Sequence, residues 1–219
     1  MTEQERQTRM QALAKELEPE NWSKLNLEKR VDLMQRVESF QAELQNRQPC
    51  AVRTEQMSTN QRGYYTNHQI VQNHDMVKYT ETSDMCMKNV LHEGRHAYQY
   101  DTVLNPEKHM EISNETLAAW TSNLAPGNYV SATTDSKAYY DQPVETDARS
   151  YAQSQSFAYT QSLNAQLTEG ENSSQSLTTS QSSGETTGNG LTSTSEGNSG
   201  LDSGAGEINS ASESYGISM

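Results

Sequence analysis

Five consecutive residues carry the types and the spacing of a metal site. His92, Glu93, Gly94, Arg95 and His96 form the pattern H-E-x-x-H. Histidines at positions i and i+4 lie on the same face of a helix, so both imidazoles can reach one ion at about 2.0–2.1 Å. Glu93 lies about 100° further round the helix, where it can hold a metal-bound water instead of ligating the metal. The pattern predicts half of a zinc site, with His92 and His96 as ligands and Glu93 as the catalytic base.

A catalytic zinc ion needs a third protein ligand and one open position. Glu145 stands in the segment Gln-Pro-Val-Glu-Thr-Asp-Ala, at the start of a predicted helix. Glu115, which follows Asn114, lies beyond His96 at a spacing that resembles that of the gluzincin aminopeptidases and thermolysin-like enzymes. Thr102 stands where a metzincin would need its third histidine, so that class is excluded. Both carboxylates remain candidates on ligand chemistry.

Several further side chains have types that suit the surroundings of such a site. Asp147 can orient a ligating imidazole through its second ring nitrogen, although a carboxylate is also favoured in a first helical turn. Tyr140 and Tyr151 can stabilise a tetrahedral intermediate as phenol donors, and tyrosines at this spacing also serve as packing residues. Among the histidines outside the motif, only His109 is kept as a candidate oxyanion donor.

The elements that must position these residues are mostly helices. Apolar residues at helical spacing, N-cap residues and Pro143 predict helices over residues 3–18, 27–45, 83–103, 114–124 and 143–165. Residues 51–54, 63–66 and 69–72 are rich in β-branched and aromatic side chains and predict a small sheet of two or three strands. We therefore expect an α+β fold that is mainly helical, in which the third helix carries the motif.

The composition changes near residue 165. All 16 cations lie before residue 150, whereas seven of the 29 acidic residues follow residue 165 and supply more than half of the net charge of −13. Ser, Gly and Thr dominate this last stretch, and such sequences are typical of disordered segments. We expect an N-terminal helix in residues 1–20, one domain over residues 21–165 and a disordered acidic tail over residues 166–219.

The same composition excludes several classes of protein. The negative charge opposes binding to nucleic acid, and no apolar run is long enough for a membrane span. The polar N-terminus does not resemble a secretory signal, so we expect a cytoplasmic protein, with export by a signal-independent route left open. Two cysteines, Cys50 and Cys86, are expected to be reduced thiols. The sequence indicates no oligomeric state.

Four features together resemble small bacterial zincin-like proteins of the gluzincin type. They are the string His-Glu-Gly-Arg-His-Ala-Tyr-Gln, an upstream Gly-Tyr-Tyr strand, the helix start at Trp22, Leu25 and Arg30, and the Gln-Pro-Val-Glu-x-Asp-Ala segment. The resemblance spans residues 21–151. It implies a zincin-like fold, Zn²⁺ as cofactor, His92, His96 and Glu145 as its ligands, and Glu93 as the base.

The expected function is a zinc-dependent metallopeptidase that hydrolyses a peptide or protein substrate through a zinc-bound water activated by Glu93. Two alternatives stay open. One is a zincin fold that has lost catalysis and serves as a binding or interaction module, with the acidic tail as a tether. The other is a toxin-like effector protease of a mobile element.

Overall fold

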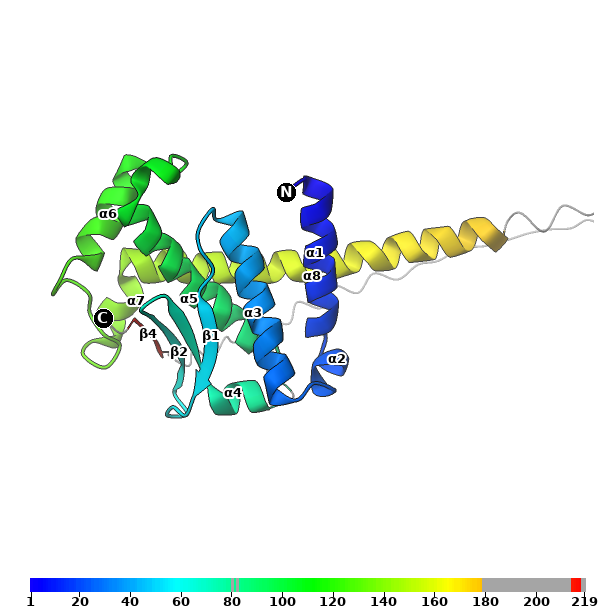
Figure 1. Cartoon of the computed structure of the whole chain (residues 1–219), viewed down its shortest axis with the longest axis horizontal. Coiled ribbons are helices and arrows are strands. Elements are labelled where there is room, and N and C mark those ends of the chain that lie inside the picture. The colour runs from blue at the N-terminus through cyan, green and yellow to red at the C-terminus, as the bar shows by residue number, and fades with distance from the viewer. Residues whose placement is uncertain (80, 82, 179–213, 218–219) are drawn as a thin grey trace, which may run out of the picture.

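The structure is a computed structural model that describes residues 1–79, 81, 83–178 and 214–217. The helices, shown in Figure 1, are α1 (Glu3–Leu17), α2 (Pro19–Ser23), α3 (Leu27–Leu44), α4 (His74–Lys78), α5 (Ser83–Leu104), the 3-10 turn η1 (Pro106–Lys108), α6 (Asn114–Leu124), α7 (Ser136–Asp141) and α8 (Pro143–Thr178). The strands are β1 (Ala51–Glu55), β2 (Gln61–Thr66), β3 (Gln69–Asn73) and β4 (Ser214–Ile217). The predicted α+β class with a mainly helical content is confirmed.

The first long helices begin where their capping residues indicate. The Thr2 hydroxyl and the Glu5 carboxylate form a capping box at the start of α1, and the Asn26 side chain accepts a hydrogen bond from the Lys29 amide at the start of α3. The apolar stripe of α1 is buried in the same core as α3, α5 and α8. Residues 1–20 therefore contribute to the domain core and do not form a separate unit.

The sheet has the strand order β1-β3-β2-β4. β1 and β3 are parallel, whereas β2 and β3 form an antiparallel hairpin. The hairpin turn places Asn67 and His68 at φ 45° and 60°, the left-handed conformation that a two-residue type I′ turn requires at both positions. The three predicted strands are thus confirmed. β4, at the outer edge of β2, was not expected from the sequence.

Helix α5 lies at the centre of the molecule and carries the H-E-x-x-H motif. One side of it packs on α3 and α8, and another packs on β2 and β3. A second apolar cluster, formed by Tyr98, Trp120, Leu124 and Val144, joins α5 to α6 and to the start of α8. Because α5 is enclosed from several sides, its polar side chains have to find partners inside the protein.

Helix α8 begins at Pro143 as predicted but ends later than expected. It continues to Thr178, whereas the sequence indicated an end near Ala165. The additional segment contains Gln, Leu and Glu residues with good helix propensity and no proline. The backbone of residues 166–178 is therefore helical, and that of residues 214–217 is a strand. The expected disorder of residues 179–213 and 218–219 lies outside the described part of the chain.

None of the helices in the described ranges is both long enough and apolar enough to cross a membrane.

Candidate metal centre

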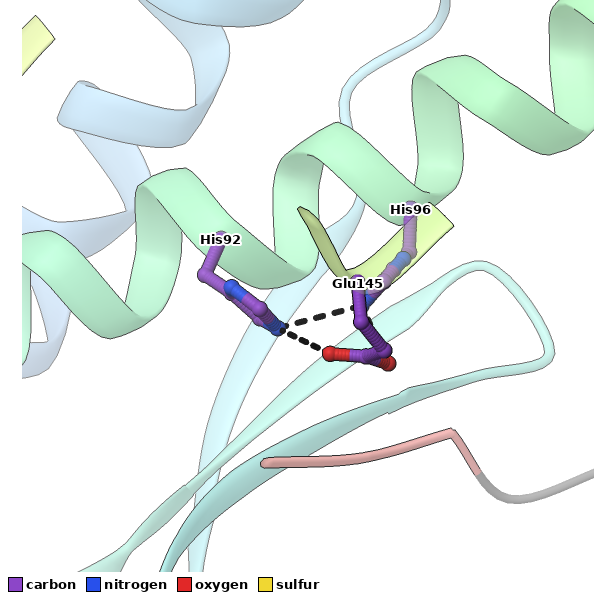
Figure 2. A group of neighbouring side chains, drawn as sticks. All are labelled: His92, His96 and Glu145. Carbon is purple, nitrogen blue, oxygen red and sulfur yellow. Dashed lines mark hydrogen bonds and ion pairs between the residues drawn. The ribbon is translucent and has the colours of Figure 1, made fainter. Parts of the chain in front are cut away.

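Two imidazoles from α5 and one carboxylate from α8 converge on one point (Figure 2). The Nε2 atoms of His92 and His96 lie 3.1 Å apart. Oε2 of Glu145 lies 3.3 Å from Nε2 of His92, and Oε1 lies 3.3 Å from Nε2 of His96. All three side chains are at most 1% exposed. Among the described residues, this is the one group of at least three potential metal ligands that lie this close together.

Hydrogen bonds around His96 determine which of its nitrogens can bind a metal. The Gln99 amide donates to the backbone carbonyl of Val144 at 2.9 Å and to the Asp147 carboxylate at 2.7 Å, so its oxygen Oε1 is left as an acceptor. That oxygen lies 2.8 Å from Nδ1 of His96. Nδ1 must therefore carry the proton, which leaves the lone pair of Nε2 facing His92 and Glu145. The sequence predicted that Asp147 contacts the imidazole. In the structure Gln99 makes this contact, and Asp147 accepts a hydrogen bond from Gln99.

The charge in the middle of the motif faces away from the converging imidazoles. Arg95 makes two hydrogen bonds to the Asp147 carboxylate, at 2.7 and 3.1 Å. Its guanidinium carbon lies 4.4 Å from the ring centre of Tyr98, 5.4 Å from that of Trp120 and 4.7 Å from that of Tyr151. Arg95 therefore connects α5 to the first turns of α8, the helix that supplies Glu145.

Gly94 allows α3 to approach α5 closely. A Cβ atom at this position would lie 2.7 Å from Oε2 of Glu38 and 2.9 Å from Nη2 of Arg47. These two residues form a buried ion pair with N–O distances of 2.6 and 3.0 Å, and Glu38 also accepts the Cys50 amide. Any larger residue at position 94 would displace a buried charge pair, and this packing explains why the residue is a glycine.

Glu93 is fully buried between α5 and the sheet. The Asn89 amide donates to its Oε1 at 3.2 Å, whereas Oε2 makes no hydrogen bond to the described residues. Burial, with a smaller contribution from the Glu145 charge, raises the pKa of Glu93 to about 8. Asn89 is held by β2 at Gly63, where a Cβ atom would lie 2.5 Å from its side-chain oxygen. The free Oε2 and the raised pKa suit a group that exchanges a proton near neutral pH.

The three converging groups perturb one another strongly. Burial lowers the pKa of His92 to about 4, although the nearby Glu145 carboxylate opposes this shift. Burial also disfavours the charged form of His96, but the Glu145 carboxylate raises the pKa of this imidazole to about 9. For Glu145, the attraction of both imidazoles outweighs burial and holds its pKa far below its ordinary value. The Glu145 carboxylate and the His96 imidazole therefore each favour the charged form of the other.

Two further tyrosines lie beside Glu145. The Tyr129 hydroxyl donates to Oε1 of Glu145 at 2.8 Å. Tyr139 packs edge-on against Tyr129, with ring centres 6.3 Å apart, and its buried hydroxyl makes no hydrogen bond to the described residues. Burial and the Glu145 charge raise the pKa of Tyr139 far above its usual range. Tyr129 belongs to the irregular connection between α6 and α7, which has no regular sequence pattern, so no sequence signal marked it.

Two of the predicted candidates lie outside this group. Glu115, the alternative third ligand, is exposed on α6 and is not one of the converging groups. His109 is buried elsewhere, with Nε2 at 2.7 Å from the Asp101 carboxylate and its ring edge-on to Tyr98. The sequence could not exclude Glu115 or His109, because the number of residues between each of them and the motif allows the chain to follow several paths.

The two tyrosine candidates separate in the structure. The Tyr151 hydroxyl donates to Gln41 on α3 at 2.5 Å, and its ring packs on Arg95, so this residue contributes to packing. Tyr140 is 58% exposed, and Arg149 lies over its ring at 3.6 Å. Tyr140, unlike Tyr151, lines a cavity next to His92.

This cavity has a volume of about 760 Å³ and borders the converging groups at His92. Its walls come from β2, α5, α7 and α8, and the lining residues are Arg62, Asp84, Met85, Lys88, His92, Tyr140, Asp141, Thr146, Arg149, Ser150, Ala152 and Gln153. A cavity of this size accommodates several residues of a peptide.

Comparison of the chain with known protein families, with curated proteins and with solved structures found no match. The resemblance to gluzincins therefore remains a prediction from the motifs.

Proposed function

We propose that this protein is a zinc-dependent metallopeptidase. The observation that carries the proposal is the convergence of His92, His96 and Glu145 beside the buried carboxylate of Glu93. Two histidines and one glutamate form a ligand set of catalytic zinc sites, which keep a further position open for water or substrate. The gluzincin-type zincin fold is part of the same proposal.

The residues present fit a tetrahedral ion. Ligand atoms bound at about 2.0–2.1 Å with tetrahedral angles lie about 3.3 Å from one another. The two Nε2 atoms lie 3.1 Å apart, and each lies 3.3 Å from a different oxygen of Glu145, which is close to this value. In addition, Oε2 of Glu145 is buried and makes no hydrogen bond to the described residues. A cation at the point between these atoms would satisfy a buried charge that the protein itself leaves incompletely paired.

A bound zinc ion would supply a Lewis acid that polarises a peptide carbonyl and lowers the pKa of water. Glu93 then accepts the proton of the attacking water at its free Oε2 and returns it to the leaving nitrogen. Burial raises the pKa of Glu93, which makes this carboxylate a stronger proton acceptor than an exposed one. Gln99 and Tyr129 keep the ligating side chains in place through the hydrogen bonds described above.

Arg149 is the group best placed to contact the substrate carbonyl. Its Nη1 is buried, makes no hydrogen bond to the described residues and lies 3.9 Å from Oε2 of Glu145. The same side chain lines the cavity next to His92. A guanidinium in this position can donate a hydrogen bond to an oxygen that becomes negatively charged during the reaction.

The decisive experiment measures bound metal and peptide cleavage on the same purified samples. We expect about one zinc per chain in the wild type and in Glu115→Ala, which removes an exposed carboxylate of the same type. Glu145→Ala and His96→Ala should lose most of it. Equal zinc in all four proteins would remove the site, and zinc lost only with Glu115→Ala would transfer the ligand role to that residue.

Glu93→Gln separates catalysis from metal binding. This variant should retain zinc and lose cleavage of a broad peptide library by at least about 10²-fold, because the proton acceptor is absent. Unchanged cleavage would exclude Glu93 as the base. Stoichiometric zinc in a wild-type protein that cleaves no peptide would instead support the interaction-module alternative.

A further inference from the structure

The C-terminal strand β4 pairs with the edge of the sheet that lies next to the metal centre. β4 and β2 are parallel, with Ser214 opposite Gln61, Gly216 opposite Tyr64 and Ile217 opposite Tyr65. Between the first two pairs, two residues of β2, Arg62 and Gly63, thus face one residue of β4, Tyr215, which places an irregularity in β2 at this point. In Figure 2, β4 and the β2–β3 hairpin lie on the side of α5 toward which the three converging side chains point.

β2 is also a wall of the metal centre. Gly63 contacts Asn89, the side chain that donates a hydrogen bond to Glu93. Arg62 lines the same cavity as His92 and Arg149. A chain segment that pairs with β2 therefore lies along the rim of this cavity.

We infer that the outer edge of β2 is a docking site for an extended peptide, and that residues Ser214–Ile217 of the same chain occupy it as an intramolecular ligand. The register in the structure identifies the occupant and its direction. Recognition of this kind uses main-chain hydrogen bonds, which any extended segment can supply, and side-chain contacts then select among sequences.

The covalent connection favours this internal occupant. Residues 179–213 join α8 to β4, so the strand binds without the entropic cost of a separate molecule. A covalent connection makes docking intramolecular and so raises the effective concentration of the strand at its site. A peptide from outside has to compete with β4 at that concentration.

Docking of β4 on β2 would affect catalysis, and this step rests on the proposed function. A substrate that adds to β2 has to displace β4 first, so the C-terminal strand would limit access of peptides to the cavity. The experiments below measure docking without metal or turnover, and their outcome is therefore independent of whether the protein is a peptidase.

A disulfide tests the register directly in the full-length chain. Paired strands lie about 4.7–4.9 Å apart, within the range of Cα separations that a disulfide bridges. We expect Gln61→Cys with Ser214→Cys to form an internal disulfide, detected by mass spectrometry, at least about tenfold faster than Gln61→Cys with Ser203→Cys. The control places the same residue type elsewhere in the C-terminal segment. Equal rates, or no bridge to position 214, would overturn the inference.

Peptide binding provides the second test. Successive N–H groups of a strand point to opposite sides, so one of the two N–H groups of Tyr215 and Gly216 faces β2. The double substitution Tyr215→Pro with Gly216→Pro therefore removes a hydrogen-bond donor to β2. A fluorescent peptide of the sequence Ser-Tyr-Gly-Ile-Ser-Met should bind this variant at least about tenfold more tightly than it binds the wild type. The control Gly204→Pro with Ala205→Pro should behave like the wild type. Equal affinity for all three proteins, or no binding to any, would contradict the inference.

Discussion

The two residues between the histidines of the motif, Gly94 and Arg95, both have roles away from the converging ligands. Gly94 leaves space for the buried pair of Glu38 and Arg47, and Arg95 binds Asp147 on α8. An arginine at this position does not argue against a metal site, because its side chain points along another face of α5. The residue types at positions 94 and 95 follow from what packs against the face of α5 on which each of them lies.

Gly94→Ala should destabilise the protein by about 1–3 kcal/mol. In an isolated helix the change would add about 1 kcal/mol of stability. Here the new Cβ atom would lie 2.7 Å from the Glu38 carboxylate and force a buried ion pair to move. Urea denaturation of wild type and variant measures the difference. A variant as stable as the wild type would show that the ion pair can shift without cost.

Gln99→Leu should weaken zinc binding about 10–100-fold without changing any ligand. The substitution keeps the approximate volume of the side chain but removes the acceptor at 2.8 Å from Nδ1 of His96. The imidazole then loses the contact that orients it and selects its tautomer. Competition with a chromogenic chelator measures the affinity. Gln99→Leu also removes a hydrogen-bond donor to Asp147, so a second variant is needed. Tyr129→Phe perturbs only the Glu145 side of the centre. Unaltered zinc affinity in both variants would exclude an orienting role for these hydrogen bonds.

At the scale of elements, the metal centre depends on how α5 and α8 are joined. α5 carries His92, His96 and Glu93, the proposed ligands and base. Glu145 lies in the first turn of α8, where Val144 packs in the apolar cluster with Tyr98 and Trp120. The ion pair of Arg95 and Asp147 and the hydrogen bonds of Gln99 connect the same two helices. Displacement of α8 by even 1 Å would therefore separate Glu145 from the imidazoles.

Asp147→Asn should lower the free energy of unfolding by about 1–3 kcal/mol, because a partly buried bidentate ion pair becomes a neutral contact. The Arg95 and Asp147 side chains are 13% and 28% exposed, so solvent screens this pair only in part. Asp141→Asn is the matched control, since Asp141 pairs with Lys137 on the exposed surface of α7. A double-mutant cycle with Arg95→Gln isolates the pair. Coupling below about 0.5 kcal/mol would show that apolar packing alone holds α8.

At the scale of the whole molecule, one core joins the N-terminal helix, the sheet and the long final helix. Residues from α1, α3, α5 and α8 share a single apolar cluster with β1 and β3. Both cysteines are in this cluster, Cys50 just before β1 and Cys86 in α5. Burial and the Glu38 charge raise the pKa of Cys50 to about 12. Its reactive thiolate is therefore scarce in the native structure at neutral pH.

Both thiols should consequently report on unfolding. With a thiol reagent such as DTNB at pH 8, we expect the native chain to react at least about 10²-fold more slowly than the chain in denaturant, because the thiolate is the reactive form. A raised pKa means that the native rate of Cys50 should rise with pH across the whole range up to about 12. Fast reaction of either thiol in the native protein would place that cysteine in a region that opens locally.

The sequence alone determined the five longest helices and the motif that one of them carries. Local periodicity, capping residues and Pro143 depend on neighbours within a few positions, and α5, α6 and the start of α8 were predicted close to their observed bounds. The candidate ligands were found for the same reason, since two histidines one turn apart share a face in any helix.

Only the tertiary structure decided which carboxylate joins them. Glu145 and Glu115 were both chemically suitable, and the packing of α8 on α5 brings one to the imidazoles while α6 exposes the other. The packing of remote elements also produces the contacts of Gln99 and Tyr129, the space beside Gly94 and the raised pKa of Glu93. They depend on distances between elements remote in the chain and on the exclusion of water between them, neither of which is encoded in the spacing of neighbouring residues.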